Sequence, residues 1–361
     1  MTLAGAVSRR VCMGALALTP WTLRAAQADD WTALIDAELR RQQVPGAAVA
    51  VVRRDQPPWL HAAGFAHLDH EVPVRPQTIF QSGSLGKQFT AVAVLLLTQD
   101  GKLGLDDPLS RWWPVPASWR RITVRHLLTH TSGLAEDYPP ERLNFQRDYS
   151  DAELLRIALR LPLTSAPGTR WQYSNVGYVL LGLLLNRVGG RFYGELLQER
   201  VFAPLGMRSA RIIDDGAIVP HRAAGYQRHP KAGLRQHDWV SPSLNRTADG
   251  SIYLSIEDLV AWDAGVRRGA LLQPALWQQA HQRARLNNGR QPDYGLGWFL
   301  DTDGTRRRIH HDGQWQGFTS WLGWYPDEGL SVAVLMNLAE GNPQKLGEML
   351  AAAASARQAA G

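Results

Sequence analysis

The sequence contains almost no cysteine, since Cys12 is the only one among 361 residues. A disulfide needs two cysteines and thiolate catalysis needs at least one. Beyond residue 12 the chain therefore has neither a disulfide nor a thiol nucleophile, and its stability must come from an apolar core. A chain of this length can bury enough surface for that, either as one large domain or as two that share an interface.

Long apolar runs are also missing near the start of the chain. The stretch Val11 to Leu23 is far shorter than the roughly 20 residues that cross a membrane. It follows Ser8-Arg9-Arg10 and precedes Ala26-Gln27-Ala28, where small residues stand at the positions that a signal peptidase reads. We therefore predict that residues 1–28 form a twin-arginine-like signal peptide, cleaved before Asp29. The mature protein is then periplasmic or secreted and keeps no stable membrane span.

The net charge is modest. It is +6 for the whole sequence, and Arg9, Arg10 and Arg24 of the predicted signal account for half of it. The remaining charge is too small to indicate a nucleic-acid surface, and the sequence shows no basic stripe interleaved with aromatic residues. We expect a small-molecule or peptide substrate as the partner, and the sequence leaves the oligomeric state open.

Strand patterns lie near both ends of the chain, and helical patterns dominate its middle. A period of two predicts strands near both ends, at Ala47–Arg53, Trp59–Phe65, Arg307–Asp312, Gly317–Tyr325 and Leu330–Leu338. A helical period dominates elsewhere, at 30–42, 84–100, 154–161, 176–188, 193–201, 256–266 and 343–357. This order predicts an α/β (α+β) fold in which both chain ends form one antiparallel sheet flanked by helices, beside a mostly helical lobe.

The same pattern predicts how the catalytic domain is divided. We place one domain at 29–361, with a sheet lobe at about 30–83 and 286–361 and a helical lobe at about 84–285. A cleft between two lobes is the usual position of a site.

The first candidate site is Ser84-Leu85-Gly86-Lys87. On a helix that starts at Ser84, residues three apart share a face, so the Lys87 amine can reach the Ser84 hydroxyl. A serine becomes a good nucleophile only when a neighbouring base takes its proton, and a lysine can be that base when burial lowers its pKa. Seen alone, Ser84 could equally be a helix N-cap.

Two further motifs carry polar side chains. Tyr173-Ser174-Asn175 precedes a helix, and its phenol could exist partly as phenolate beside a lysine and exchange protons with it. His311-Asp312-Gly313 ends a predicted strand and is followed by Gln314 and Trp315. The glycine lets a substrate lie against the strand edge. Each motif by itself is also compatible with a purely structural role, as a core aromatic or a surface histidine.

Taken together in this order, the three motifs resemble the serine beta-lactamase and DD-peptidase family. The likeness is greatest to its class C beta-lactamase-like branch, which includes D-Ala-D-Ala carboxypeptidases, D-aminopeptidases and esterases. It covers about Val44 to Asn337. Other stretches agree: Phe80-Gln81-Ser82-Gly83, the segment from Ile122 to Leu134, Pro167-Gly168, and Tyr294-Gly295-Leu296-Gly297-Trp298.

The resemblance implies a role for each matching position. Ser84 corresponds to the nucleophile, Lys87 to its proton partner and Tyr173 to the general base and acid. Substrate contacts are implied for Asn175, His311, Gly313, Gln314 and Trp315, and the oxyanion hole for the backbone N–H groups of Ser84 and Gln314. The family implies no metal and no cofactor. The expected activity is hydrolysis of an amide or ester through an acyl-Ser84 intermediate, by a peptidase, an esterase or a lactamase.

Asp312 departs from the family pattern, because lactam- and peptide-cleaving members often have threonine there to hold a substrate carboxylate. A carboxylate at this position repels another one unless Arg306 or Arg308 offsets it. The departure favours neutral substrates, or substrates with a free amine.

Three alternatives remain open at this point. The segment Ser82-Gly83-Ser84-Leu85-Gly86 is close to the Gly-x-Ser-x-Gly motif of an α/β-hydrolase-type esterase, but that fold needs a parallel sheet. The same scaffold could also serve a non-hydrolytic penicillin-binding or sensor protein. A metal site at His310, His311 and Asp312 is disfavoured, because adjacent strand residues point to opposite faces.

Overall fold

The computed structural model describes residues 31–237 and 239–360, and residues 32–361 form one compact unit. The predicted signal peptide lies outside the described residues. Among the described residues, no helix is both long and apolar enough to cross a membrane.

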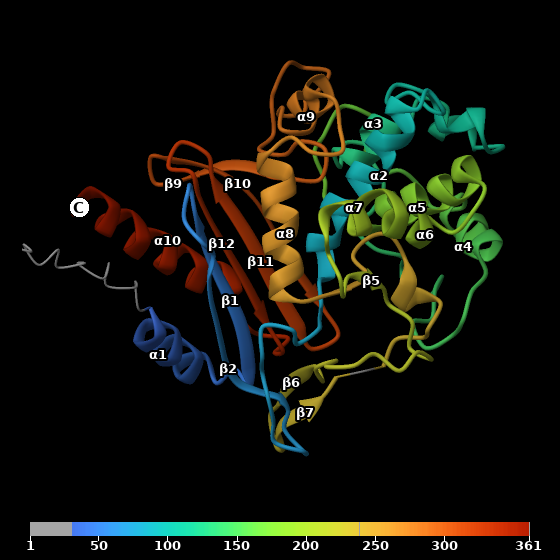
Figure 1. Cartoon of the computed structure of the whole chain (residues 1–361). Coiled ribbons are helices and arrows are strands. Elements are labelled where there is room, and N and C mark those ends of the chain that lie inside the picture. Colours follow the sequence, from blue (N-terminus) through green and yellow to red (C-terminus); the bar gives the residue numbers. More distant parts are fainter. Residues whose placement is uncertain (1–30, 238, 361) are drawn as a thin grey trace, which may run out of the picture. The chain divides into compact units, whose positions relative to one another are not determined.

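A seven-stranded antiparallel sheet joins the two ends of the chain (Figure 1). Its strands, in spatial order, are β3 (Val72–Pro73), β2 (Trp59–His67), β1 (Gly46–Arg53), β12 (Leu330–Met336), β11 (Phe318–Tyr325), β10 (Arg306–Trp315) and β9 (Phe299–Asp303). The central contact is the antiparallel pairing of β1 with β12, which runs from Ala47↔Met336 to Arg53↔Leu330. The predicted union of the two ends is therefore confirmed, and the antiparallel pairing excludes the α/β-hydrolase sheet.

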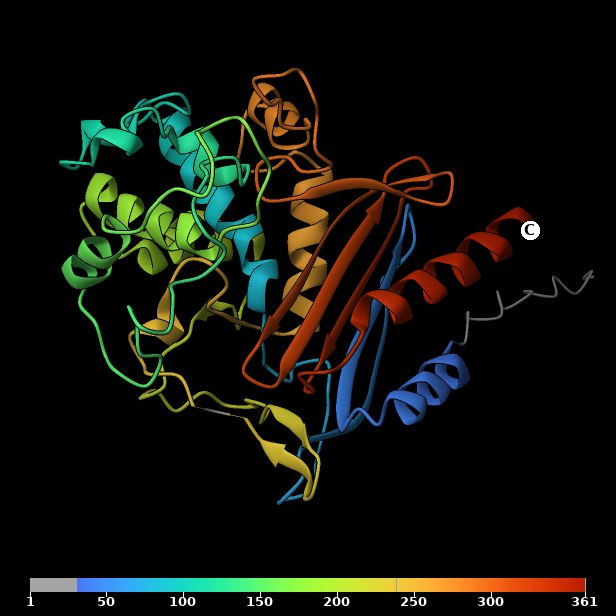
Figure 2. The ribbon, with the colours of Figure 1, turned by 180° about the vertical axis from the view of Figure 1, so that it is seen from behind.

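Helices cover both faces of this sheet. α1 (Thr32–Gln42) and α10 (Pro343–Ala360) lie on one face, as the rear view shows (Figure 2). α8 (Ile256–Arg267) packs on the opposite face against β1 and β12 (Figure 1). Both α8 and the sheet residues that it covers are rich in buried apolar side chains. α8 lies within the range of about 84–285 that we expected for the helical lobe, but it packs on the sheet.

The remaining helices gather beside the sheet. They are α2 (Lys87–Gln99), α3 (Val124–Leu128), α4 (Asp151–Ala158), α5 (Asn175–Gly189), α6 (Tyr193–Leu197), α7 (Ala203–Leu205) and α9 (Pro274–Ala280). Short 3₁₀ turns occur at η1 (Gly83–Gly86), η2 (Leu109–Arg111), η3 (Ala117–Trp119) and η5 (Leu244–Arg246), and a π-helical turn at η4 (Gln198–Phe202). Two small sheets that the sequence did not predict are also present: β4 (Phe80–Gln81), β8 (Ile252–Leu254) and β5 (Arg211–Ile212), and the hairpin of β6 (Tyr226–His229) and β7 (Gly233–Gln236).

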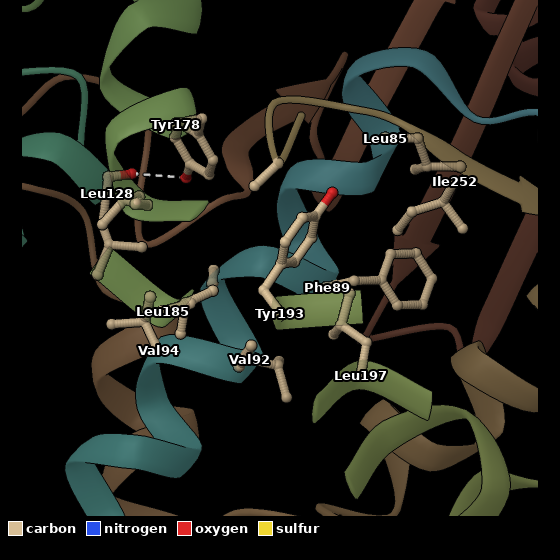
Figure 3. Close-up of a cluster of buried hydrophobic side chains, with 14 of the residues drawn as sticks. Leu85, Phe89, Val92, Val94, Leu128, Tyr178, Leu185, Tyr193, Leu197 and Ile252 are labelled. Atoms are coloured by element: carbon tan, nitrogen blue, oxygen red, sulfur yellow. Dashed lines mark hydrogen bonds between the residues drawn. The ribbon is translucent and has the colours of Figure 1, made fainter. Parts of the chain in front are cut away.

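The core of the helical lobe surrounds α2 (Figure 3). Phe89 and Val92 are fully buried and lie near Tyr193 and Leu197 of α6. Because α2 is apolar on almost every side, neighbouring elements pack around it, and its first turn is held in place. This turn carries Lys87, and the 3₁₀ turn before it carries Ser84.

Candidate active site around Ser84

Ser84 and Lys87 lie at the junction between a 3₁₀ turn and a helix. The predicted helix start at Ser84 is replaced by η1, and α2 begins at Lys87. The spacing of three residues still brings the side chains together, since Lys87 Nζ donates a hydrogen bond of 3.0 Å to Ser84 Oγ. Ser84 is partly buried, whereas Lys87 is 0% exposed.

The Lys87 amine has two further acceptors from distant parts of the chain. They are Asn175 Oδ1 and the backbone carbonyl oxygen of Asp249, both at 2.6 Å. Burial lowers the pKa of Lys87 from 10.5 to about 8, although nearby carboxylates, with Asp249 and Asp137 foremost, oppose this shift. At pH 7 roughly one molecule in ten then carries a neutral lysine amine beside Ser84.

Tyr173 and Asn175 reach the same place from the start of α5. Ser174 caps this helix through its Oγ, which accepts from the N–H of Gly177 at 3.1 Å. Lys87 Nζ lies 4.9 Å from the centre of the Tyr173 ring. Burial raises the pKa of the Tyr173 phenol well above its usual value, although a hydrogen bond with Ser84 opposes this. The phenol form is thus favoured, in contrast to the partial phenolate that we expected from the sequence.

Strand β10 passes directly beside the Ser84 turn. It continues to Trp315 instead of ending at Asp312 as predicted. A Cβ atom on Gly313 would lie 2.0 Å from the carbonyl oxygen of Ser82, and one on Gly83 would lie 2.4 Å from the backbone nitrogen of Gln314. Only glycine permits this approach, because real Cβ atoms do not come so close to backbone atoms. The backbone nitrogens of Ser84 and Gln314 are thereby held on neighbouring segments.

His311 lies on β10, three residues before Gln314, and is fully buried. Its Nδ1 contacts the carbonyl oxygen of Asp312 at 2.6 Å and must be the donor, because a carbonyl only accepts. Its Nε2 then accepts from the Tyr294 hydroxyl at 3.0 Å. Burial lowers the pKa of His311 to about 4, so the ring is neutral at pH 7. Both ring nitrogens have protein partners, and a substrate contact for His311 stays a prediction.

Trp315 and Asn175 line a pocket of about 350 Å³ together with Ser84 and Gln314. We call it the Ser84 pocket. The Trp315 indole donates to Asn245 Oδ1 at 2.6 Å, which fixes the ring. Most of the wall is apolar, from Leu143, Phe145, Leu154, Val179, Trp239, Val240 and Leu244, and its charged members are Asp137 and Asp249. The pocket thus offers an apolar surface and negative charge next to the serine hydroxyl.

His130 is a site residue that sequence reasoning missed. It is 0% exposed, and its ring lies 4.2 Å from that of Tyr173, centre to centre. Its Nδ1 accepts from the backbone N–H of Ser174 at 3.0 Å, next to Tyr173. Burial holds the pKa of His130 well below its ordinary value. The histidine in His130-Thr131-Ser132-Gly133 was visible in the sequence, but nothing in that motif indicates which ring it packs against.

Metal-binding geometry is not found in the described part of the chain, where no group of three or more His, Cys, Asp or Glu side chains could hold an ion. His310 and His311 diverge as strand alternation requires. His310 contacts Asp301 and Trp321, whereas His311 contacts Tyr294.

Comparison with known proteins agrees with this geometry. A model of the Beta-lactamase family matches residues 31–356. The chain belongs to the Beta-lactamase family. This confirms the family resemblance that the three motifs indicated.

Individual relatives support the same assignment. Penicillin-binding protein 4* of Bacillus subtilis is 29% identical over 299 residues, which are 78% of this chain and 65% of that protein. The chain thus spans a little under two thirds of that relative's length. D-amino acid amidase from Ochrobactrum anthropi is 25% identical with a TM-score of 0.78, covering 90% of this chain and 98% of the other. A penicillin-binding protein from Bacillus halodurans is 25% identical with a TM-score of 0.76, and the match covers 89% of this chain and 98% of the other.

Proposed function

We propose that this member of the Beta-lactamase family is a serine hydrolase that cleaves an amide or ester through an acyl-Ser84 intermediate. The observation that carries the proposal is the 3.0 Å hydrogen bond between Ser84 Oγ and a fully buried Lys87 whose pKa burial lowers to about 8. A neutral amine at this position can take the serine proton, which is the condition for nucleophilic attack.

The acylation step assigns a task to each side chain. Ser84 Oγ attacks the carbonyl carbon of the substrate while its proton passes to neutral Lys87. The backbone N–H groups of Ser84 and Gln314 stabilise the oxyanion. The Tyr173 phenol then donates a proton to the leaving nitrogen or oxygen as that bond breaks, and Lys87 returns the proton to Tyr173. Water hydrolyses the ester on Ser84 by the same groups in reverse order.

Electrostatics narrow the substrate class. Asp137 and Asp249 line the Ser84 pocket, and Asp312 lies close enough to raise the pKa of Lys87. These carboxylates disfavour a substrate carboxylate next to the scissile bond and suit a neutral group or an amine there. The name of the similar D-amino acid amidase supports an amide among the substrates to be tested.

The proposal is tested by turnover of a p-nitrophenyl ester, a chromogenic lactam and a D-amino acid amide. Wild type should hydrolyse at least one of them, whereas Ser84→Ala and Lys87→Met should lose 1,000-fold or more in kcat/KM, on the order of what removal of a nucleophile or its base costs. Lys102→Met, which changes an exposed lysine, is the matched control. Activity of Lys87→Met close to that of Lys102→Met would refute the assignment. An adduct on Ser84 that never turns over would identify a sensor instead.

We also infer export, with residues 1–28 as a removable signal and residues 29–361 as the catalytic domain. The twin arginine at Arg9-Arg10 and the small residues Ala26 and Ala28 support this. Intact mass of the protein recovered from the periplasm or medium tests it. A mature chain beginning at Asp29 is expected, and a full-length chain confined to the cytoplasm would contradict it.

A further inference from the structure

A second, smaller pocket adjoins the Ser84 pocket. It has a volume of about 140 Å³ and shares His237 and Gln316 with its larger neighbour. Its other walls come from separate segments: His67 of β2, Gln81 of β4, Gln236 of β7, Tyr253 of β8, Phe318 of β11 and the stretch from Arg222 to Gly225. We call it the Arg222 pocket. Because a water molecule takes roughly 30 Å³ in the liquid, the space accommodates a small polar group and the carbon atom that carries it.

Two buried amide side chains that line this pocket each have one atom without a hydrogen-bond partner. Gln316 is 5% exposed and its Nε2 has no hydrogen-bond acceptor, while Gln81 is 6% exposed and its Oε1 has no donor. The orientation of Gln316 is fixed, because its Oε1 accepts from the backbone N–H groups of Trp239 and Val240 at 2.8 and 2.9 Å. Its NH₂ group is therefore a buried donor without an acceptor, on a residue that lines the pocket. Buried polar atoms in native proteins are usually paired with protein or with ordered water, so these two atoms mark a place for a polar partner.

The charge of the Arg222 pocket is opposite to that of the Ser84 pocket. Arg222 lines it and donates weakly to the Tyr253 hydroxyl at 3.4 Å. No Asp or Glu is among the described residues that line it, whereas Asp137 and Asp249 line the Ser84 pocket. Arg222 is exposed, and a guanidinium and a primary amide from residues that line one small space match the oxygens of a carboxylate.

We propose that the Arg222 pocket binds a carboxylate carried by the substrate at a distance from its scissile bond. This inference rests on the proposed hydrolase function and adds a specificity subsite to it. The carboxylates around Ser84 repel a negative group there, while Arg222 and Gln316 attract it to the neighbouring pocket. The two pockets together favour a substrate whose carboxylate is separated from the reacting carbonyl by a short spacer.

Two matched ester pairs test the subsite, one with the carboxylate on the acyl side of the scissile bond and one with the carboxylate on the leaving group. One pair is p-nitrophenyl pentanoate and the mono-p-nitrophenyl ester of glutarate, which differ by a carboxylate at the end of the acyl chain. The other is phenyl acetate and 3-acetoxybenzoate, which differ by a carboxylate on the leaving group. Rates are corrected for spontaneous hydrolysis, and the readout is the ratio of kcat/KM within each pair.

Wild type should prefer the carboxylate in at least one pair by roughly tenfold, as expected for a charge-assisted hydrogen bond that is partly screened by water. Arg222→Ala should abolish that preference. Gln316→Glu should reverse it, because the isosteric carboxylate still accepts from Trp239 and Val240 but repels the ligand. Arg235→Ala, which removes an exposed positive charge from the adjacent β7, is the control and should keep the preference.

The outcomes separate the two levels of the proposal. If wild type hydrolyses the neutral esters in a Ser84-dependent manner but shows no Arg222-dependent preference in either pair, the subsite is wrong and the hydrolase assignment stands. A preference that Arg235→Ala removes as fully as Arg222→Ala would also overturn the subsite, since long-range charge would then explain it. If no ester of either pair is hydrolysed and Ser84 is not acylated, the hydrolase assignment itself fails.

Discussion

Replacing Lys87 by methionine tests the buried lysine through stability instead of turnover. The side chain is fully buried, and burial lowers its pKa from 10.5 to about 8. Each pKa unit corresponds to about 1.4 kcal/mol, so the fold disfavours the ammonium form by about 3 kcal/mol relative to the unfolded chain. Methionine has a similar length and no charge, and it removes this titration while it fills the same space.

The sign of the pH dependence follows from the direction of the shift. Because the folded pKa is depressed, the unfolded chain binds one more proton than the folded chain between about pH 8 and 10.5. The stability that comes from the neutral amine is complete above about pH 10.5 and is lost as the pH falls through 8. Between pH 7 and 10.5, wild type should therefore gain about 3 kcal/mol in unfolding free energy relative to Lys87→Met.

Urea unfolding of both proteins over this pH range measures the difference. Other titrating groups are common to both proteins and cancel to first order. Lys102→Met, at an exposed position, serves as the control, and its difference from wild type should stay nearly constant. A constant difference for Lys87→Met as well would mean that the folded and unfolded chains share one lysine pKa, and the case for a neutral base would collapse.

Three further perturbations test other parts of the account. Burial raises the pKa of Asp263 from 3.8 to about 6, so its protonated form adds stability that is complete below pH 3.8 and is lost as the pH rises through 6. Urea unfolding should show Asp263→Asn gaining about 2 kcal/mol on wild type between pH 4 and 7, and a pH-independent difference would contradict this. Gly83→Ala should lower kcat/KM by roughly 100-fold or more, on the order of what loss of one oxyanion donor costs. Gly101→Ala is the control and should keep activity, because Gly101 also has a positive φ but has nothing within 4 Å of the new Cβ. Equal activities of the two variants would show that the contact with Gln314 is unimportant. Tyr173→Phe should lower kcat by roughly 100-fold or more through loss of the proton donor, and a wild-type kcat would exclude Tyr173 from proton transfer.

Local patterns predicted the long elements of the fold well. The nearly continuous apolar runs of β1 and β12 and the apolar side chains of α2 are strong signals, and the structure has these elements within a few residues of the prediction. β4 and β5 were missed because two residues cannot show a period of two. β9 was missed as well, because its sequence Phe-Leu-Asp-Thr-Asp reads as a turn and is a strand only through pairing with β10.

The site was predicted from motifs, and its surroundings were not. The spacing of Ser84 and Lys87 sufficed to bring their side chains together, because one helical turn separates them. The roles of His130 and Asp249 depend on contacts across 44 and 162 residues, which no local pattern encodes. The same holds for the burial that keeps Tyr173 a phenol and His311 a neutral ring.

The pH dependence of Ser84 modification tests the central claim most directly. A fluorophosphonate reacts with an activated serine, and mass analysis of the proteolytic peptides locates the adduct. The account predicts one adduct, on Ser84, with a rate that rises with pH around an apparent pKa of about 8 and that falls in Lys87→Met. An adduct elsewhere, or a Ser84 rate that is unchanged in Lys87→Met across the same pH range, would contradict it.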